Sequence, residues 1–446
     1  LRVPCFAQNQ PVSIMRSQSE PDAVTDHTGP VGTTVPLSFN EGHLLMQDDY
    51  VNKARSLVTA LCGVQPNRRT GSPGNRQATA LVARKLLQQG YEVDATPFDC
   101  LDYVTGGAKL RHGDEAFDVH VSPYSLGCDV STELASVSTV TELEETSCEG
   151  KMLLMKGSIC SEQLMPKNFI FYNPERHQRI IALLERQKPA AVITATGFKP
   201  EQAGALNPFP LIVDGDFDFP SVYCKPSVGD ALSTLVGEKL RLRIDATRLD
   251  SEATNVVATL HAGAPHKVIV TAHVDAYENS PGASDNASGT VVLLLCAEML
   301  SGYEGGLCLE FVALNGEDHY SAGGQMDYLR RYGDRFPRVA LAVNVDGVGY
   351  RRGRSCYSFY ECPAALEAQV EDALRRHDGL ARGPQWSSGD HMIFAQQGVP
   401  CLALTSQYAE ELMVTVTHTS RDTPDTLDCE KLVEVSRALV SVVRAL

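Results

Sequence analysis

The segment "TAHVDAYENSPGASDNASGT", residues 271–290, places a histidine and several acids directly after the apolar run "KVIV". His273 and Asp275 follow that run, and Asp285 stands just before a second apolar run at 290–300. Imidazole and carboxylate groups are ligands that zinc prefers in proteins, and both also transfer protons. The segment therefore predicts metal or acid–base chemistry.

Further acids and a histidine follow other apolar runs. Glu317 and Asp318 follow "CLEFVAL", Asp346 follows "ALAVNV", and "THTSRDTPD" supplies His418. Each has a simpler interpretation when taken alone: a surface pair, a solvated loop or a turn, and for Asp285 a helix N-cap. Acids or a histidine follow all three of the apolar runs "KVIV", "CLEFVAL" and "ALAVNV", which favours a shared site over three independent coincidences.

Several carboxylates and two histidines in one confined site would be unfavourable without a cation, because like charges repel. Histidine with carboxylates suits zinc. Four terminal ligands and one additional carboxylate suit two metal ions that share a bridging aspartate. A further glutamate can then act as general base toward water.

The elements that must position these residues are strands alternating with helices. Such alternation predicts an α/β fold with a doubly wound, mostly parallel sheet flanked by helices, whose ligands bind beyond the carboxyl ends of the strands. The continuous apolar character of the strands indicates burial on both faces. The expected strands are "KVIVTA", "CLEFVAL", "ALAVNV" and "PCLALT", and the expected helices lie near 45–66, 75–89, 286–301, 321–332, 363–378 and 429–444.

Residues 101–247 have a different texture. Short strand-like runs alternate with loops rich in Gly, Pro, Asn and Asp, and 175–188 is the one long helix expected there. This pattern predicts a separate β-rich domain. Residues 1–40 are rich in Ser, Pro, Gln and Thr and predict a flexible N-terminal lead; the chain starts at Leu1 rather than Met, which leaves a missing signal segment open.

Composition excludes several classes of function. The net charge of −16 over 446 residues, with "RRGR" at 351–354 as the densest basic run, does not favour a nucleic-acid partner. No apolar run reaches the roughly 18–20 residues of a membrane helix. The 13 cysteines show no paired spacing and favour reduced thiols and a cytoplasmic setting, with secretion as the alternative.

The ordered motifs "HVD", "PGASDNASG", "NGED", "NVDG" and "HT" resemble those of the co-catalytic di-zinc aminopeptidase family, which includes leucyl-type aminopeptidases and glutamate carboxypeptidase II. "SSGDHMIFAQQGVP" is similar to the Ser-Asp-His loop of that family. The resemblance covers about 45–98 and 250–446. It implies a zinc exopeptidase fold and a non-proline cis bond between Asp285 and Asn286.

The resemblance also implies a role for each site residue. One zinc ion would be held by His273 and Asp346, the other by Asp318 and His418, and Asp285 would bridge the two; Asp275 would orient His273, and Glu317 would be the general acid/base. The acidic pair is usually Glu-Glu in the family. Asp318 is one methylene shorter, so its loop must lie closer to the metal.

Within 101–247, "FPSVYCKPSVGDALSTLVGEKLRLRIDA" resembles the protease-associated domain that some relatives insert before the catalytic strands. In those relatives the insert covers the active site. The expected organisation is a lead at 1–40, a zinc peptidase catalytic domain at 41–100 and 248–446, and an inserted domain at 101–247.

The function implied is that of an aminopeptidase, which removes N-terminal residues from peptides through a hydroxide bridging two zinc ions. The alternatives are a zinc carboxypeptidase, a one-zinc enzyme similar to glutaminyl cyclase, and a non-catalytic binding protein. A carboxypeptidase pocket should carry arginines, with Arg330, Arg351 and Arg382 as candidates. The partner of the oxyanion stays open among Tyr360, Tyr408 and the loop at Asp390-His391.

Overall fold

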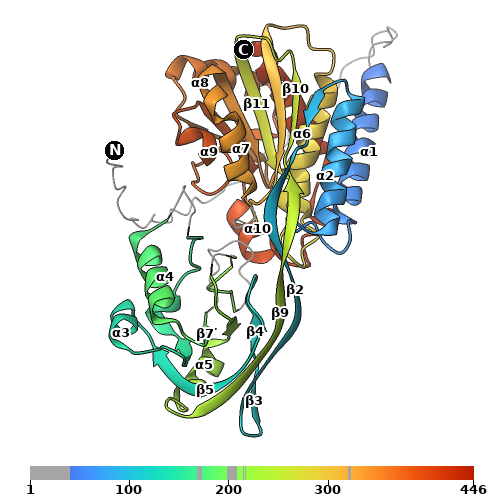
Figure 1. The fold of residues 1–446 in the computed structure, drawn as a ribbon. Coiled ribbons are helices and arrows are strands. Elements are labelled where there is room, and N and C mark those ends of the chain that lie inside the picture. The colour runs from blue at the N-terminus through green and yellow to red at the C-terminus, as the bar shows by residue number, and fades with distance from the viewer. Residues whose placement is uncertain (1–40, 168–172, 198–207, 214, 216, 320–322) are drawn as a thin grey trace, which may run out of the picture. The chain divides into compact units, whose positions relative to one another are not determined.

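The computed structural model describes residues 41–167, 173–197, 208–213, 215, 217–319 and 323–446. They form two eight-stranded sheets with helices packed against them (Figure 1). The lead expected over 1–40 lies outside the described residues. Among the helices that are described, none is long and apolar enough to cross a membrane.

The first sheet runs in the order β1-β10-β12-β11-β13-β16-β14-β15. Its four central strands pair in parallel, and so do β14 and β15, while β10 pairs antiparallel with β12 and β14 antiparallel with β16, which confirms the mostly parallel α/β sheet. The strands are β1 (Glu92–Asp94), β10 (Val256–Leu260), β11 (His266–His273), β12 (Leu307–Leu314), β13 (Val339–Val345), β14 (Ser355–Tyr360), β15 (Leu380–Arg382) and β16 (Cys401–Ser406).

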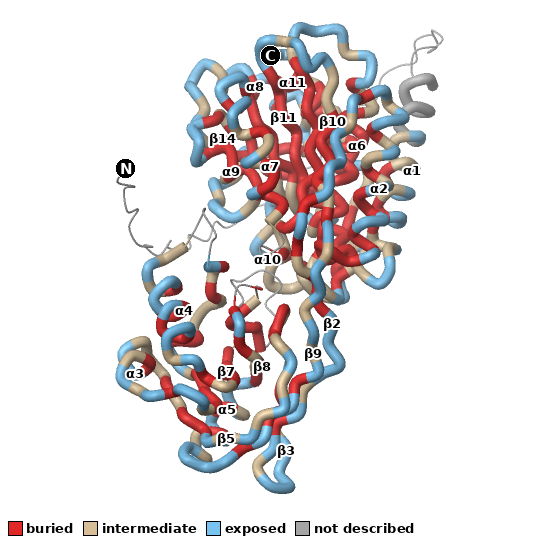
Figure 2. The backbone as a smooth tube through the Cα atoms, in the orientation of Figure 1, coloured by how far each residue is buried: buried red, intermediate tan, exposed pale blue. Residues whose placement is uncertain are grey.

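Both faces of this sheet are covered by helices. On β11, Val268 and Val270 pack into one apolar cluster with residues of α1, α2, α6, α8 and α11, whereas Ile269 packs into a second cluster with α7 and α9. Since side chains alternate between the faces of a strand, a strand buried on both faces reads as a continuous apolar run. Figure 2 shows the resulting buried residues in β11 and α6.

Helix α6 is apolar around nearly its whole circumference because it lies between β11 and α11. Helix α2 begins with Ser72 as N-cap and Pro73 in its first turn, two residues before the expected start at 75, and Gly90 follows it with a φ of 89°. The helices and helical turns packed on the first sheet are α1 (Glu41–Cys62), α2 (Pro73–Gln88), η2 (Ala283–Ala287), α6 (Ser288–Met299), α7 (Gly324–Tyr332), η4 (Gly333–Arg338), α8 (Ala364–Leu374), α9 (Met392–Ala395), α10 (Ala409–Thr415), η5 (Pro424–Thr426) and α11 (Cys429–Ala445).

The second sheet runs in the order β3-β2-β9-β5-β6-β7-β8-β4 and is built from the segment expected to be β-rich. Two 16-residue strands, β2 and β9, pair antiparallel along almost their whole length (Figure 1). Its assignment to a protease-associated domain stays a prediction. Its elements are β2 (Pro97–His112), β3 (Glu115–Phe117), β4 (His120–Val121), β5 (Cys128–Val137), α3 (Val140–Glu145), β6 (Met152–Met155), η1 (Gly157–Cys160), α4 (Glu175–Gln187), β7 (Ala191–Ala195), β8 (Ser221–Cys224), α5 (Pro226–Ser233) and β9 (Lys239–Thr254).

The structure differs from the sequence-based elements at a few points. Strand β9 of the second sheet and strand β10 of the first are separated by the single residue Asn255, so the sequence contains no turn between the two sheets. The side chain of Asn255 bonds to the backbone of Asn315 and Gly324. The helix expected from residue 286 begins at Ser288, behind the irregular turn η2. The cysteines of the described residues are free thiols.

Candidate metal centre

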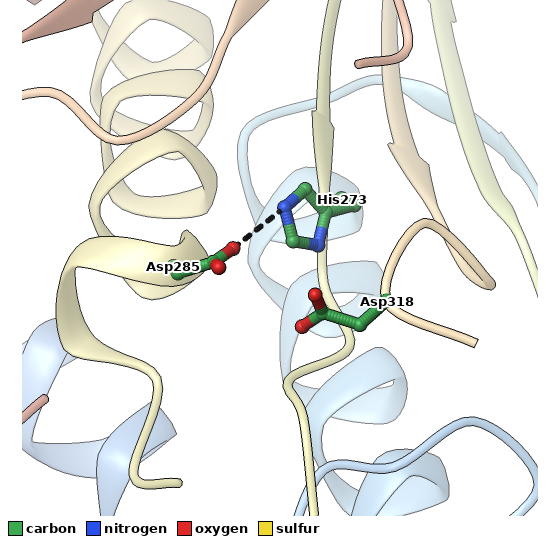
Figure 3. A group of neighbouring side chains, drawn as sticks. All are labelled: His273, Asp285 and Asp318. Carbon is green, nitrogen blue, oxygen red and sulfur yellow. Dashed lines mark ion pairs between the residues drawn. The ribbon is translucent and has the colours of Figure 1, made fainter. Parts of the chain in front are cut away.

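The candidate ligands converge at the carboxyl ends of the central strands, where the fold rule for open α/β sheets places a site. His273 is the last residue of β11, and Asp346 follows the last residue of β13. Asp318 lies in the loop after β12, and His418 follows α10. Figure 3 shows His273, Asp285 and Asp318 turned toward one another; their ligand atoms lie within 4.8 Å of each other.

Asp285 directs its two carboxylate oxygens toward two different groups. Oδ1 lies 3.1 Å from His273 Nε2, which in turn lies 3.5 Å from Asp346 Oδ1. Oδ2 lies 3.0 Å from His418 Nε2, which lies 2.7 Å from Asp318 Oδ1. The structure therefore assembles two histidine–aspartate pairs, one on each oxygen of a shared carboxylate.

The turn that carries Asp285 is fixed by residues from elsewhere in the chain. The carboxylate of Asp422 accepts hydrogen bonds from the backbone N–H groups of Ser284 (2.7 Å) and Asp285 (3.0 Å). The buried guanidinium of Arg68 donates to the backbone oxygens of Val274, Pro281 and Gly282. Asp285 is therefore not the N-cap that its position suggests, because Asp422 supplies the acceptor and leaves the Asp285 side chain free.

Close packing also fixes this turn from the side of β13. A Cβ atom on Gly289 would lie 2.1 Å from the backbone oxygen of Val345, so only glycine permits this approach of α6 to the strand. The Asn286 side chain donates to the same oxygen at 2.9 Å. The peptide bond between Asp285 and Asn286 is cis, as the resemblance implied.

Asp275 is fully buried and links two loops of the centre. Its Oδ1 lies 3.5 Å from His273 Nδ1, and its Oδ2 accepts a hydrogen bond from the backbone N–H of Asp318 at 3.2 Å. This bond draws the Asp318 loop inward, which explains how the shorter aspartate side chain reaches His418. His319 is buried against the same carboxylate, 3.7 Å from Oδ2.

The electrostatics of the centre are dominated by crowded carboxylates. Burial alone would lower the pKa values of His273 and His418, but the surrounding aspartates outweigh burial and raise both well above their usual range. Burial raises the pKa of Glu317 well above its usual range, and the carboxylates of Asp346 and Asp318 raise it further. The protein groups by themselves therefore favour a bound positive charge.

The donor atoms also lie close enough together to share a metal ion. Two ligand atoms at the roughly 2.0–2.2 Å that zinc prefers, in a tetrahedral arrangement, lie about 3.3–3.6 Å apart. The distance between His273 Nε2 and Asp346 Oδ1 is 3.5 Å, and the other three nitrogen–oxygen distances, at 2.7–3.1 Å, are shorter than that edge. Both ring nitrogens of His273 and Oδ2 of Asp318 are buried without a hydrogen-bond partner among the described residues. The residues present thus fit zinc.

A cavity of about 890 Å³ opens onto the centre and is bordered by Asp285, Glu317, Asp318, Asp346 and His418. Residues from the region of the second sheet contribute to its wall together with residues of the first. The former are Gln163, Met165, Phe209, Pro210 and Val213, and the apolar residues among the latter include Trp386, Tyr408, Leu412 and Met413.

Some residues of the centre escaped the sequence interpretation. Tyr277 and Glu278 carry no role in the sequence interpretation, but the ring of Tyr277 stacks on His418 and Glu278 pairs with Arg69. Asp422 stands in the quoted "THTSRDTPD" without an assigned role, and its acidic type next to His418 was the available signal. Of the oxyanion candidates, Tyr408 borders the cavity. The Tyr360 hydroxyl bonds to the backbone of Trp386 instead.

The profile of Peptidase family M28 matches residues 255–443, the segment that carries all the candidate ligands. The chain is 26% identical over 192 residues, 40% of its length, to Aminopeptidase YwaD of Bacillus subtilis. It is 25% identical over 252 residues, 53% of its length, to an aminopeptidase of Pseudomonas aeruginosa. The aligned parts span 41% and 45% of those relatives.

Solved structures share the fold over most of the chain. The aminopeptidase from Aneurinibacillus sp. strain AM-1 superposes with a TM-score of 0.68 at 24% identity, covering 88% of this chain and 93% of that one. BSAP, a zinc aminopeptidase from Bacillus subtilis, gives a TM-score of 0.65 at 20% identity and covers 88% and 94%. The segment at 255–443, which holds both histidine–aspartate pairs, is therefore similar to peptidase family M28.

Proposed function

We propose that this protein is a zinc-dependent aminopeptidase that holds two zinc ions. The observation that carries the proposal is the placement of Asp285 between two histidine–aspartate pairs, with one carboxylate oxygen toward each pair. The relatives named as aminopeptidases support the reaction class, and BSAP, which is named a zinc aminopeptidase, supports the metal.

Each side chain then has a distinct task. One ion would be held by His273 and Asp346, the other by His418 and Asp318, and Asp285 would contact both. Asp275 holds His273 in orientation, the usual arrangement of a carboxylate behind a metal-binding histidine. When bound, the zinc ions lower the pKa of water and polarise a carbonyl group.

Glu317 is the proposed proton carrier. It borders the cavity, and burial beside other carboxylates raises its pKa, so its carboxyl group can accept a proton and hold it. In peptide hydrolysis that proton comes from the attacking water and goes to the leaving amine. The partly enclosed cavity limits competing water around this transfer.

The walls of the cavity favour a substrate amine over a substrate carboxylate. The described residues that line it include no lysine or arginine, whereas Glu410 and Glu411 border it. The three arginines considered for a carboxypeptidase are paired elsewhere, Arg330 with Asp327, Arg351 with Asp425 and Arg382 with Glu367. A free N-terminus therefore matches this cavity better than a free C-terminus.

Metal analysis combined with a panel of substrates tests the proposal. We expect about two zinc ions per chain, hydrolysis of aminoacyl substrates and unblocked peptides, and no hydrolysis of N-blocked peptides. One zinc ion with cyclisation of N-terminal glutamine would instead support the one-zinc transferase. A chain that holds no zinc and hydrolyses nothing would support a non-catalytic binding protein.

A further inference from the structure

Tyr277 lies two residues beyond Asp275, in the segment that joins β11 to η2. Its ring is stacked on the imidazole of His418, with the centroids 4.5 Å apart and the planes inclined by 11°. It is also stacked on His319, with centroids 5.6 Å apart and planes inclined by 19°. Three nearly parallel rings therefore stand beside the centre, and one of them belongs to a proposed ligand.

We propose that Tyr277 is a positioning residue that holds His418 in the orientation required for zinc binding. The inference rests on the proposed function, because it assigns Tyr277 a role toward a ligand of that centre. Tyr277 itself binds no metal in this arrangement. It acts through the plane of the His418 ring.

The two histidines of the centre are supported in different ways. The Nδ1 atom of His273 faces a buried carboxylate, that of Asp275, at 3.5 Å. The contacts of His418 with carboxylates are made by Nε2, and among the described residues its Nδ1 has no hydrogen bond to an acceptor. A metal-bound histidine usually has such an acceptor, so His418 needs another means of fixing its ring. The flat face of Tyr277 provides it.

The backbone conformation of His418 is a second reason why its ring requires support. Its φ is 58°, in the left-handed region that non-glycine residues rarely adopt and that persists only where the surroundings impose it. His418 Nε2 must nevertheless face Asp285 Oδ2 at 3.0 Å and Asp318 Oδ1 at 2.7 Å. The stacked ring of Tyr277 limits rotation of the His418 imidazole away from these two oxygens.

Tyr277 is held in turn by its neighbour Glu278. The Glu278 carboxylate accepts a hydrogen bond from the guanidinium of Arg69 at 3.0 Å and another from the hydroxyl of Tyr103. Arg69 is buried, pairs with Asp102 and lies with its guanidinium carbon 3.9 Å from the ring centroid of Tyr103. Since Asp102 and Tyr103 belong to β2, a long strand of the second sheet is linked through Glu278 and Tyr277 to His418.

Zinc affinity measured by competition with a chromogenic chelator tests the role directly. The full chain, loaded with zinc, is compared with Tyr277→Phe, which keeps the ring, and Tyr277→Leu, which removes it. A stacked aromatic pair is worth up to about 1.5 kcal/mol, or roughly tenfold in affinity. We expect Tyr277→Leu to bind one of the two zinc ions about tenfold more weakly, and Tyr277→Phe to stay within about twofold of the wild type.

Two further measurements separate positioning from general damage. Excess zinc should restore hydrolysis by Tyr277→Leu, which a defect in folding would not allow. Tyr408→Leu removes an aromatic ring that borders the same cavity without stacking on either histidine, and it should leave zinc affinity unchanged. Circular dichroism and thermal unfolding of the metal-free proteins check that each variant folds; should Tyr277→Leu not fold, Tyr277→Met takes its place under the same criteria.

The outcomes distinguish this inference from the proposed function. A wild-type chain that binds no zinc would overturn both. Zinc binding by the wild type with equal affinity in Tyr277→Leu would overturn the inference alone. Equal weakening in Tyr277→Phe and Tyr277→Leu would also overturn it, because the hydroxyl rather than the ring would then be responsible.

Discussion

The carboxylate of Asp285 contacts both histidine–aspartate pairs. One of its oxygens lies 3.1 Å from His273 and the other lies 3.0 Å from His418, so the same carboxylate contacts both pairs. Removing a terminal ligand affects one proposed ion, whereas removing Asp285 affects both. The residue therefore offers the sharpest test of a shared two-metal centre.

Asp285→Ala should reduce the metal content to well below one zinc ion per chain after dialysis, with loss of measurable hydrolysis. The physical reason is that both proposed ions lose a charged ligand at the same time. Elemental analysis of the purified variant measures this, with Asp230→Ala, an exposed aspartate of α5, as the control that should keep the wild-type content. Two tightly held ions in Asp285→Ala would contradict the bridge.

Glu317→Gln should lower kcat by about 10²- to 10⁴-fold while zinc content stays near the wild-type value. Glutamine keeps the size and polarity of the side chain but cannot accept the proton. Steady-state kinetics on an aminoacyl substrate, paired with metal analysis, provides the measurement. Glu304→Gln, in the exposed connection before β12, should retain full activity. A fully active Glu317→Gln would show that another group carries the proton.

The candidate metal centre depends on the parallel pairing of three strands and on the turn that carries Asp285. Parallel pairing of β11 with β12 and β13 brings the ends of these strands to one edge, with His273 paired to Leu314 and Thr271 to Asn344. Turn η2 then presents Asp285 to that edge. Asp422 and Arg68, from opposite ends of the sequence, hold this turn in place.

A buried ion pair links two strands of the first sheet away from the metal centre, and it stabilises the fold without contacting the candidate ligands. Lys267 of β11 contacts Glu310 of β12, and Tyr328 donates to the same carboxylate at 2.8 Å. All three side chains are buried. Because removal of one partner leaves an unpaired buried charge, such a pair is sensitive to single substitution.

Lys267→Met should lower the free energy of unfolding by about 3–5 kcal/mol. The double variant Lys267→Met/Glu310→Leu should recover part of that loss, since it leaves no buried charge without a partner, although the Tyr328 hydroxyl loses its acceptor. Urea unfolding at pH 7 measures both, and zinc affinity of the folded variants should stay at the wild-type value. Equal destabilisation of the single and double variants would show that packing, not the unpaired charge, determines the loss.

Residues from the regions of both sheets line the cavity that opens onto the metal centre. Met165 and Phe209 from the region of the second sheet border it together with Trp386 and Tyr408 from the first. Trp386 is the single tryptophan of the chain. Its fluorescence therefore reports on this cavity when a substrate analogue binds.

Removal of zinc by a chelator should lower the thermal midpoint of unfolding, and added zinc should restore it. The metal-free protein must keep Asp285, Asp318 and Asp346 close together, and a ligand that binds only the folded chain stabilises it by mass action. At free zinc of 100 times the dissociation constant, the gain is about 2.7 kcal/mol per site. A midpoint that does not respond to zinc would contradict a site formed only on folding.

Local residue patterns predicted the parallel strands and the candidate ligands at their ends. Strands buried on both faces read as continuous apolar runs, and the acids and histidines follow those runs in the chain, so both signals are local. The helix start at Ser72 and the stop at Gly90 are local in the same way. The shorter Asp318 was visible as a departure from the family pattern and predicted a loop closer to the centre, but the hydrogen bond to Asp275 that holds this loop was not predicted.

The way in which these groups are held depends on contacts between distant segments of the folded chain. Asp422 caps the turn of Asp285, Tyr277 stacks on His418, and Arg69 anchors Glu278 across 209 positions of sequence. Such contacts depend on the relative placement of distant segments, which hydrophobic periodicity does not encode. Asp285 taken alone looked like an ordinary helix cap and Glu278 had no assigned role, because His418 and Arg69 lie far away in the chain and meet them only on folding.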